Sequence, residues 1–349
     1  MQYIGYFIFA FFLSLFITAI VRMVMQKYHI VDIPRTKTRK IHKKKIPLGG
    51  GLAIFISFFL IIFLLLSNSF GQEILPKHIW GLFFGGLVLM VGGILDDKYN
   101  LKAKYQILFP ILAALTVILF GIGPHEITNP LGGVFTLDQW VLSVGTLGNW
   151  VVLADTLVFC WLMGMMFTTK FLDGLDGLVT GVVSIGAMMI FFLSLQAQWY
   201  QPEVALFSIV FAGCCLGFLV WNWHPAKIFL GEGGSLFTGF MIGSLAIISG
   251  GKIATTLLVM GIPALDVIRV IMRRIQKKKP IHIGDNEHLH FKLIESGLTQ
   301  RQAVLLMYVI SFLFGVTTLF LQSSEKLVAL VFLFILMLLL GVWFGKKSR

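Results

Sequence analysis

Long runs of apolar residues follow one another along the whole chain. A helix that crosses a lipid bilayer needs about 20 such residues. Hydrophobic residues make up 57% of the sequence and charged residues only 13%, whereas soluble domains carry about 25% charged residues. The sequence therefore predicts an all-α polytopic integral membrane protein, and we interpret residues 1–349 as a single membrane-embedded domain.

We predict about eleven membrane spans. Their approximate ranges are 4–25, 50–66, 79–95, 105–123, 151–168, 178–196, 204–221, 235–250, 254–271, 303–321 and 327–344. The first range lacks the basic start and the small-residue cleavage site of a signal peptide, so we expect it to remain a span. Cys160, Cys214 and Cys215 all fall in spans. We expect them to be small buried hydrophobic residues, not disulfide partners or metal ligands.

Basic residues concentrate on one side of the predicted membrane. The loops on that side are 27–49, 96–104, 169–177, 222–234 and 272–302, whereas the other side carries only Lys77, Lys252 and Lys326. By the positive-inside rule the basic side is cytoplasmic, with the N-terminus outside and the C-terminus in the cytoplasm. Topology and attraction to anionic lipids account for part of this charge. On the outer side, turn residues near 127–137 predict a small β-hairpin.

Carboxylates gather at the cytoplasmic ends of several predicted spans. Asp173 and Asp176 lie three residues apart in an Asp-Gly-Leu-Asp-Gly stretch, and Asp96 and Asp97 are adjacent. A carboxylate at the centre of a membrane helix costs about 2.5–3.5 kcal/mol, so these groups lie at the membrane surface or line a polar site. A solvated turn and a plain helix stop remain the alternatives.

Several further side chains suggest a divalent cation and phosphate groups. Close carboxylates need a counter-ion, and Glu232 would be a ligand for a hard cation such as Mg²⁺. His288 and His290 alone are weak evidence for a zinc site, because no third ligand is evident. Asp266 and Arg269 are three residues apart, and we expect an ion pair between them.

Taken in order, the motifs resemble the polyprenyl-phosphate N-acetylhexosamine-1-phosphate transferase family of bacterial envelope synthesis. They are Asp32-Ile33-Pro34 with Arg39-Lys40-Ile41-His42 and Pro47-Leu48-Gly49-Gly50, Leu95-Asp96-Asp97, Phe171 to Leu178, Asn222 with Pro225 to Phe229 and Gly231 to Ser235, Asp266 with Arg273-Arg274, and His288-Leu289-His290. The eleven-span topology and the His-Leu-His pattern resemble the branch that makes polyprenyl-diphosphate N-acetylglucosamine. The branch that makes the peptidoglycan precursor is more distant.

The resemblance implies transfer of a sugar-1-phosphate, most simply GlcNAc-1-phosphate, from a UDP-amino sugar to undecaprenyl or another polyprenyl phosphate, with release of UMP. It implies Mg²⁺, or Mn²⁺ in its place, and we predict Asp97 and Glu232 as the ligands. We predict Asp96, Asp97, Asp173 and Asp176 as catalytic residues. The predicted substrate-binding residues are Lys43, Lys170, Asn222, Lys227, His288 and His290.

The same resemblance places the protein in the bacterial cytoplasmic (inner) membrane, with its active site on the cytoplasmic face and the lipid tail in a groove between spans. The product would feed glycans such as lipopolysaccharide or teichoic acid, and a homodimer remains open. Three positions differ from the family pattern: Lys170 stands where asparagine is usual, Glu232 where aspartate is usual, and Phe291 where a further histidine is usual. The alternatives are a phospho-MurNAc-pentapeptide transferase and a catalytically altered protein that binds or transports lipid phosphates. We expect no nucleic acid partner.

Overall fold

The computed structural model describes residues 2–34, 44–69, 74–124, 126–128, 133–137, 140–143, 149–250, 252–276, 278 and 288–347. The longer helices are α1 (Gln2–Lys27), α2 (Gly50–Ser69), α3 (Pro76–Tyr99), α5 (Leu108–Leu119), α6 (Val152–Leu172), α7 (Leu178–Ser194), α8 (Pro202–Asn222), α9 (Gly231–Ile248), α11 (Gly261–Gln276), α13 (Gln300–Thr317) and α14 (Ser323–Lys347). The shorter helices are α4 (Ala103–Gln106), α10 (Ile253–Val259) and α12 (Leu289–Glu295), with a 3-10 turn at Ala197–Trp199.

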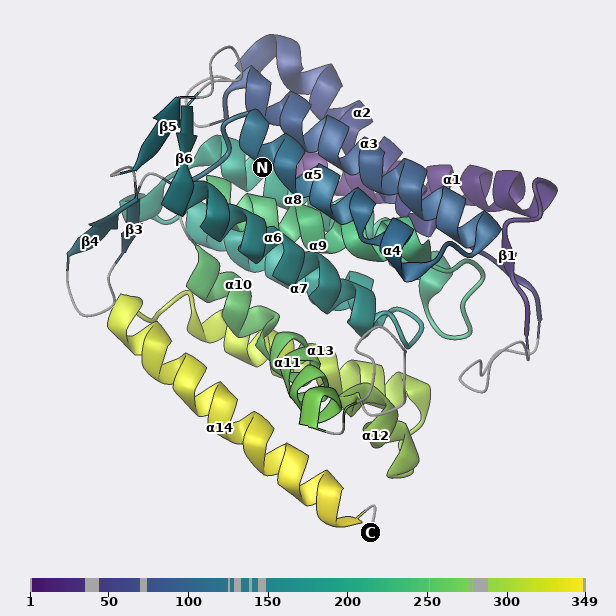
Figure 1. Ribbon diagram of the computed structural model, residues 1–349. Helices are drawn as coiled ribbons and strands as arrows, with labels where there is room; N and C mark the ends of the chain where they lie inside the picture. Colours follow the sequence, from purple (N-terminus) through teal and green to yellow (C-terminus); the bar gives the residue numbers. More distant parts are fainter. Residues whose placement is uncertain are drawn as a thin grey trace.

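Helix α9 lies at the centre of the bundle. Its side chains from Gly231 to Ile247 are buried, with Glu232 as the partial exception. It packs mainly against α6 and α3, and also against α2 and α7, while α8 packs against α1 and α7. Helices α10 to α13 cover one flank, and α14 runs along the outer edge (Figure 1). The first turn of α9, which includes Glu232, is therefore held in place by helices on several sides.

The described residues support a multi-pass membrane protein. Among them, six helices are long and apolar enough to cross a membrane, and the bent pair α10–α11 is a seventh candidate. Apolar helices over Gly50–Leu65, Ala103–Leu119 and Leu178–Ser194 are shorter. Outward-facing aromatic residues such as Phe12 and Phe16, 60% and 65% exposed, suit a lipid environment. The number of about eleven spans and the orientation remain predictions.

The predicted span over 254–271 is not one continuous helix. It is divided into α10 and α11, which are bent by 77° relative to each other. Pro263 lacks the N–H group that would continue the ladder to the carbonyl of Val259, so α10 ends before it. Within the predicted span over 105–123, α4 and α5 meet at Ile107, because Pro110 has no N–H group for the carbonyl of Gln106. Unlike the bent pair, Ala103–Leu119 remains one apolar helical segment.

Short strands pair at both ends of the bundle. Strands β3 (Glu126–Thr128) and β4 (Val134–Thr136) are antiparallel, with Ile127 opposite Phe135, which confirms the predicted hairpin. A second pair, β5 (Val141–Ser143) and β6 (Asn149–Val151), lies beside it. At the other end, β1 (Val31–Asp32) pairs with β2 (Ile46–Pro47). Figure 1 shows β3 to β6 at one end, and β1, α4 and α12 at the opposite end.

The cysteine prediction needs one correction. Cys214 and Cys215 are buried and unpaired, but Cys160 is exposed on α6. Leu162 on the same helix is buried and lies against Gly243 of α9. An apolar side chain on the outer face of a membrane helix can contact lipid and needs no protein partner.

Glycines let α2 and α3 approach the start of α9 very closely. A Cβ atom at Gly234 would lie 2.7 Å from the Cα of Gly51, and one at Gly233 would lie 3.2 Å from the Cα of Gly93. Side chains at these positions would push the helices apart. The approach holds the first turn of α9 beside the last turn of α3, where Asp96 and Asp97 lie.

We expect Gly93→Ala to destabilise the protein by about 1–3 kcal/mol, because its new Cβ would overlap the backbone of Gly233. The measurement is the thermal unfolding temperature in detergent. Gly164→Ala is the matched control, since a Cβ at that position meets no atom within 4 Å. Equal unfolding temperatures for both variants would contradict the packing described for α3 and α9.

Candidate active site

Carboxylates from three helices meet at one end of the bundle. Asp97 lies in the last turn of α3 and Glu232 in the first turn of α9, which starts at Gly231 rather than near the predicted residue 235. The backbone N–H of Glu232 donates a hydrogen bond to Oδ1 of Asp97 over 3.2 Å. Asp97 also interacts electrostatically with Asp96 and Asp173. The two residues predicted to bind the metal are therefore neighbours.

Asp173 shows how crowded these negative charges are. It follows the last residue of α6 directly. Burial raises the pKa of its carboxyl to about 8, and the charges of Glu232 and Asp176 act in the same direction. A cation near these carboxylates would relieve the repulsion between their negative charges.

One cation already lies inside this group. The ammonium of Lys170, in the last turn of α6, forms an ion pair with Oε1 of Glu232. It also donates a hydrogen bond to Oε1 of Gln106 over 3.2 Å. Lys170 is predicted from the sequence to bind substrate, whereas Gln106 carries no predicted role. No motif marks this glutamine, because it stands alone on the short helix α4.

Gln106 links Lys170 to Asp96. Its side-chain amide donates to Oδ1 of Asp96 over 3.0 Å and to the carbonyl of Leu101 over 3.0 Å. The backbone N–H of Leu101 donates to the same carboxylate oxygen over 2.7 Å. Oδ1 of Asp96 is thus held from two sides, which orients its second oxygen, Oδ2.

Asp176 and Asn222 bind protein groups and so lock two loops together. Oδ2 of Asp176 lies 2.7 Å from Nδ1 of His224 and accepts a hydrogen bond from the backbone N–H of Ala226 over 3.1 Å. Oδ1 of Asn222 accepts a hydrogen bond from the N–H of Gly177 over 3.0 Å, and its amide donates to the carbonyl of Ile228. In this structure both side chains serve to position the loops.

The predicted Asp266–Arg269 ion pair is confirmed, with Nη2 of Arg269 at 2.7 Å from Oδ1 of Asp266. The structure adds a second partner: Nδ1 of His288 lies 2.9 Å from Oδ2. The backbone N–H of Leu289 donates to that oxygen as well. The His288 ring stacks on Phe171. The region around His288 is thereby held against the Asp173 stretch.

His290 packs into the space that Gly174 leaves open. A Cβ atom at Gly174 would clash with Nε2 of His290. That nitrogen is buried without a hydrogen-bond partner among the described residues. Burial lowers the pKa of His290 to about 3; the neighbouring His288 acts in the same direction, while Asp266 opposes it. His290 is therefore a neutral imidazole at neutral pH.

The remaining predicted residues lie apart from this group or outside the described residues. The ammonium of Lys227 lies over the ring of Trp221, 5.3 Å from its centroid, and the side chain is exposed. Lys43 lies outside the described residues. The described residues contain no group of three or more His, Cys, Asp or Glu side chains that could hold a metal ion by themselves.

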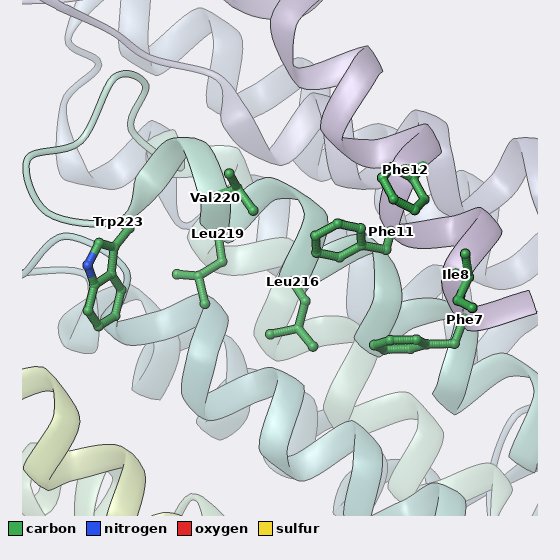
Figure 2. Close-up of a pocket in the computed structure, with 8 residues that line it drawn as sticks. All are labelled: Phe7, Ile8, Phe11, Phe12, Leu216, Leu219, Val220 and Trp223. Atoms are coloured by element: carbon green, nitrogen blue, oxygen red, sulfur yellow. The ribbon is translucent and has the colours of Figure 1, made fainter. Parts of the chain in front are cut away.

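An apolar groove runs along the surface between α1 and α8. Its volume is about 550 Å³. Figure 2 shows the side chains that line it, which are Phe7, Ile8, Phe11, Phe12, Leu216, Leu219, Val220 and Trp223. Trp223 directly follows Asn222, so the groove reaches the loop that is locked to Asp176. Such a lining suits a hydrocarbon chain.

Comparison with known proteins gives a consistent set of relatives. Residues 79–250 match the sequence profile of glycosyl transferase family 4. The chain is 33% identical over 334 residues to "Probable undecaprenyl-phosphate N-acetylglucosaminyl 1-phosphate transferase" of Bacillus subtilis, covering 94% of this chain and 87% of that protein. It is 30% identical over 329 residues to decaprenyl-phosphate N-acetylglucosaminephosphotransferase of Mycobacterium leprae, covering 85% and 78%. Identity to phospho-N-acetylmuramoyl-pentapeptide-transferase of Prochlorococcus marinus is 29% over 325 residues, covering 86% and 85%.

The low pKa of His290 predicts a pH-dependent stability. Between about 3 and 6.5 the unfolded chain binds a proton at this residue that the folded chain does not bind, so stability falls as the pH falls through this window. We expect His290→Gln to lose less thermal stability than the wild type between pH 7 and pH 5. The raised pKa of Asp173 acts in both proteins and cancels in the comparison.

His29→Gln serves as the control, because His29 is exposed after the end of α1. It should keep the wild-type dependence on pH. Parallel curves for the wild type and His290→Gln would contradict a neutral, buried His290.

Proposed function

The chain belongs to glycosyl transferase family 4, and we propose that it transfers GlcNAc-1-phosphate from UDP-GlcNAc to polyprenyl phosphate. The names of its relatives support this transfer. The observation that supports it in this chain is the meeting of Asp97, Asp173 and Glu232 at the ends of three apolar helices. Carboxylates at the end of a membrane bundle lie at the membrane surface, where a lipid-borne phosphate can meet a soluble nucleotide.

The reaction is a phosphoryl transfer. An oxygen of the polyprenyl phosphate attacks the β-phosphorus of the UDP-sugar. The bond between that phosphorus and the bridging oxygen breaks, and UMP leaves with the electron pair. The product is polyprenyl-diphospho-GlcNAc. Such reactions depend mainly on positioning and on neutralising charge, so the protein needs well-placed ionic groups more than a covalent intermediate.

The oxygen donors present fit Mg²⁺. This ion is typically held by one or two carboxylates together with substrate phosphates. Asp97 and Glu232 are adjacent and crowded by Asp173, which favours a cation between them. We assign these two residues as the ligands. When bound, Mg²⁺ would neutralise the charge that develops on the leaving UMP.

The other residues of the site orient the reactants. Asp96 has one oxygen fixed by Gln106 and Leu101, and its other oxygen would orient the acceptor phosphate or accept its proton. Asp173 would hold the nucleotide or a metal-bound water. Asp176 and Asn222 keep the loop from His224 to Ile228 in place. Lys43, Lys227, His288 and His290 remain candidates for contacts with phosphates.

We place the site on the cytoplasmic face of the bacterial cytoplasmic membrane. The basic loops lie on the same side as the carboxylates in the predicted topology, and nucleotide sugars are soluble substrates. The groove between α1 and α8 is one candidate for the prenyl tail of the acceptor, because its lining is apolar and it leads to Trp223.

The product would enter envelope glycan synthesis. Among the alternatives, a transporter is disfavoured, since the relatives bear the names of transferases.

UMP release should require both polyprenyl phosphate and Mg²⁺ in proteoliposomes. We expect Asp97→Asn to lower this rate about a hundredfold or more, because a neutral amide would misplace and weaken the metal. Glu295→Gln is the control, since Glu295 is half exposed and pairs only with Lys292 among the described residues. Full turnover of Asp97→Asn, or turnover in EDTA, would contradict the assigned metal site.

A panel of donors tests the sugar. We expect UDP-GlcNAc to release UMP faster than UDP-MurNAc-pentapeptide under the same conditions, because the GlcNAc transferases are the more similar relatives. The assay measures UMP together with the lipid product. A clear preference for the pentapeptide donor would favour the alternative activity.

A further inference from the structure

Lys170 is positioned between two groups that hold it in different ways. Its ammonium forms an ion pair with Oε1 of Glu232 and donates a hydrogen bond to Oε1 of Gln106. The side chains of Lys170 and Glu232 are 19% and 23% exposed, so water screens the pair only in part. A lysine ammonium carries three N–H donors. The contact with Gln106 is its hydrogen bond, whereas Oε1 of Glu232 accepts no hydrogen bond among the described residues, so N–H donors remain for a further acceptor.

Gln106 fixes the hydrogen bond to Lys170 independently of Glu232. Its amide NH₂ group donates to Asp96 and to the carbonyl of Leu101. Only its carbonyl oxygen then remains to accept from Lys170. If the ion pair opened, Lys170 would still be tethered within the site, beside Asp96.

A cation at Glu232 and the Lys170 ammonium compete for the same carboxylate. Glu232 is one of the two proposed Mg²⁺ ligands, and its Oε1 is already taken by Lys170. Two positive groups sharing that oxygen would repel each other. Without either cation, the charge of Glu232 would add unrelieved to the crowding at Asp173.

We propose that Lys170 is an internal substitute for the metal. In the metal-free protein its ammonium neutralises Glu232, and binding of Mg²⁺ displaces it. Gln106 then retains the displaced ammonium, whose free N–H donors turn to a phosphate oxygen of the donor diphosphate. This inference rests on the proposed function, because it requires Mg²⁺ at Glu232. It makes Lys170 a substrate-binding residue and Gln106 the residue that positions it.

The test is a Mg²⁺ titration of the full-length protein in detergent after EDTA treatment, followed by the thermal unfolding temperature. Removing the competing charge should lower the Mg²⁺ midpoint of Lys170→Gln about tenfold. The charge-conserving Lys170→Arg should keep a midpoint at or above that of the wild type. Lys104→Gln removes an exposed positive charge that lies over Tyr105 and should leave the midpoint unchanged.

Steady-state kinetics supply a second readout. Lys170→Gln should need less Mg²⁺ for half-maximal UMP release but show a higher KM for the UDP-sugar, because the displaced ammonium no longer meets the diphosphate. A merely structural role would not move these two values in opposite directions. If Lys170→Gln does not fold, Lys170→Arg and Gln106→Leu replace it. Gln106→Leu frees Lys170 from its tether, so it should raise the KM for the UDP-sugar.

The outcomes separate this inference from the function on which it rests. A wild-type response to Mg²⁺ with the same midpoint in Lys170→Gln would overturn the substitution by Lys170 alone. A wild-type protein whose stability and UMP release ignore Mg²⁺ would overturn the metal assignment and this inference together. A lowered midpoint in Lys170→Gln but not in Lys104→Gln supports the inference.

Discussion

The close contact of α9 with α2 and α3 is the constraint on which the rest of the site depends. Gly51 and Gly93 face Gly234 and Gly233 with almost no space between the backbones. Only this approach allows the N–H of Glu232 to reach the carboxylate of Asp97. In lipid, where no hydrophobic effect drives helices together, small residues at the crossing make such contact favourable. The glycines therefore position charged groups although they carry no functional atoms.

Carboxylates that lie close together repel one another, and in this protein specific partners stabilise each of them. Lys170 lies against Glu232, Gln106 and Leu101 hold Asp96, and His224 holds Asp176. Each partner comes from a different segment. A phosphoryl-transfer site needs concentrated negative charge for a metal, yet must remain folded before the metal and substrate arrive. Internal cations and amide donors reconcile these two demands.

Particular residues show which features of the structure could be predicted from the sequence. The hairpin near 127–137 and the Asp266–Arg269 pair follow local rules, turn chemistry and helical spacing, and both were predicted. The span predicted over 254–271 remains a candidate, but it is broken into two helices, because Pro263 interrupts the hydrogen-bond ladder where apolar composition alone suggested one helix. Gln106 was missed, since its importance comes from what it touches. Asp176 and Asn222 appeared as site residues, but in this structure they bind loop groups.

The sequence by itself determined the helical membrane class and the positions of the acidic motifs, and its resemblance to known transferases indicated the reaction. Burial in lipid depends on local composition, so apolar runs predict it without knowledge of neighbours. Only the tertiary structure decided which charged groups meet. Lys170 and Gln106 are 64 residues apart, and Glu232 and Asp97 are 135 residues apart. Contacts over such separations depend on how helices cross, and helix crossing is set by packing that no single segment encodes.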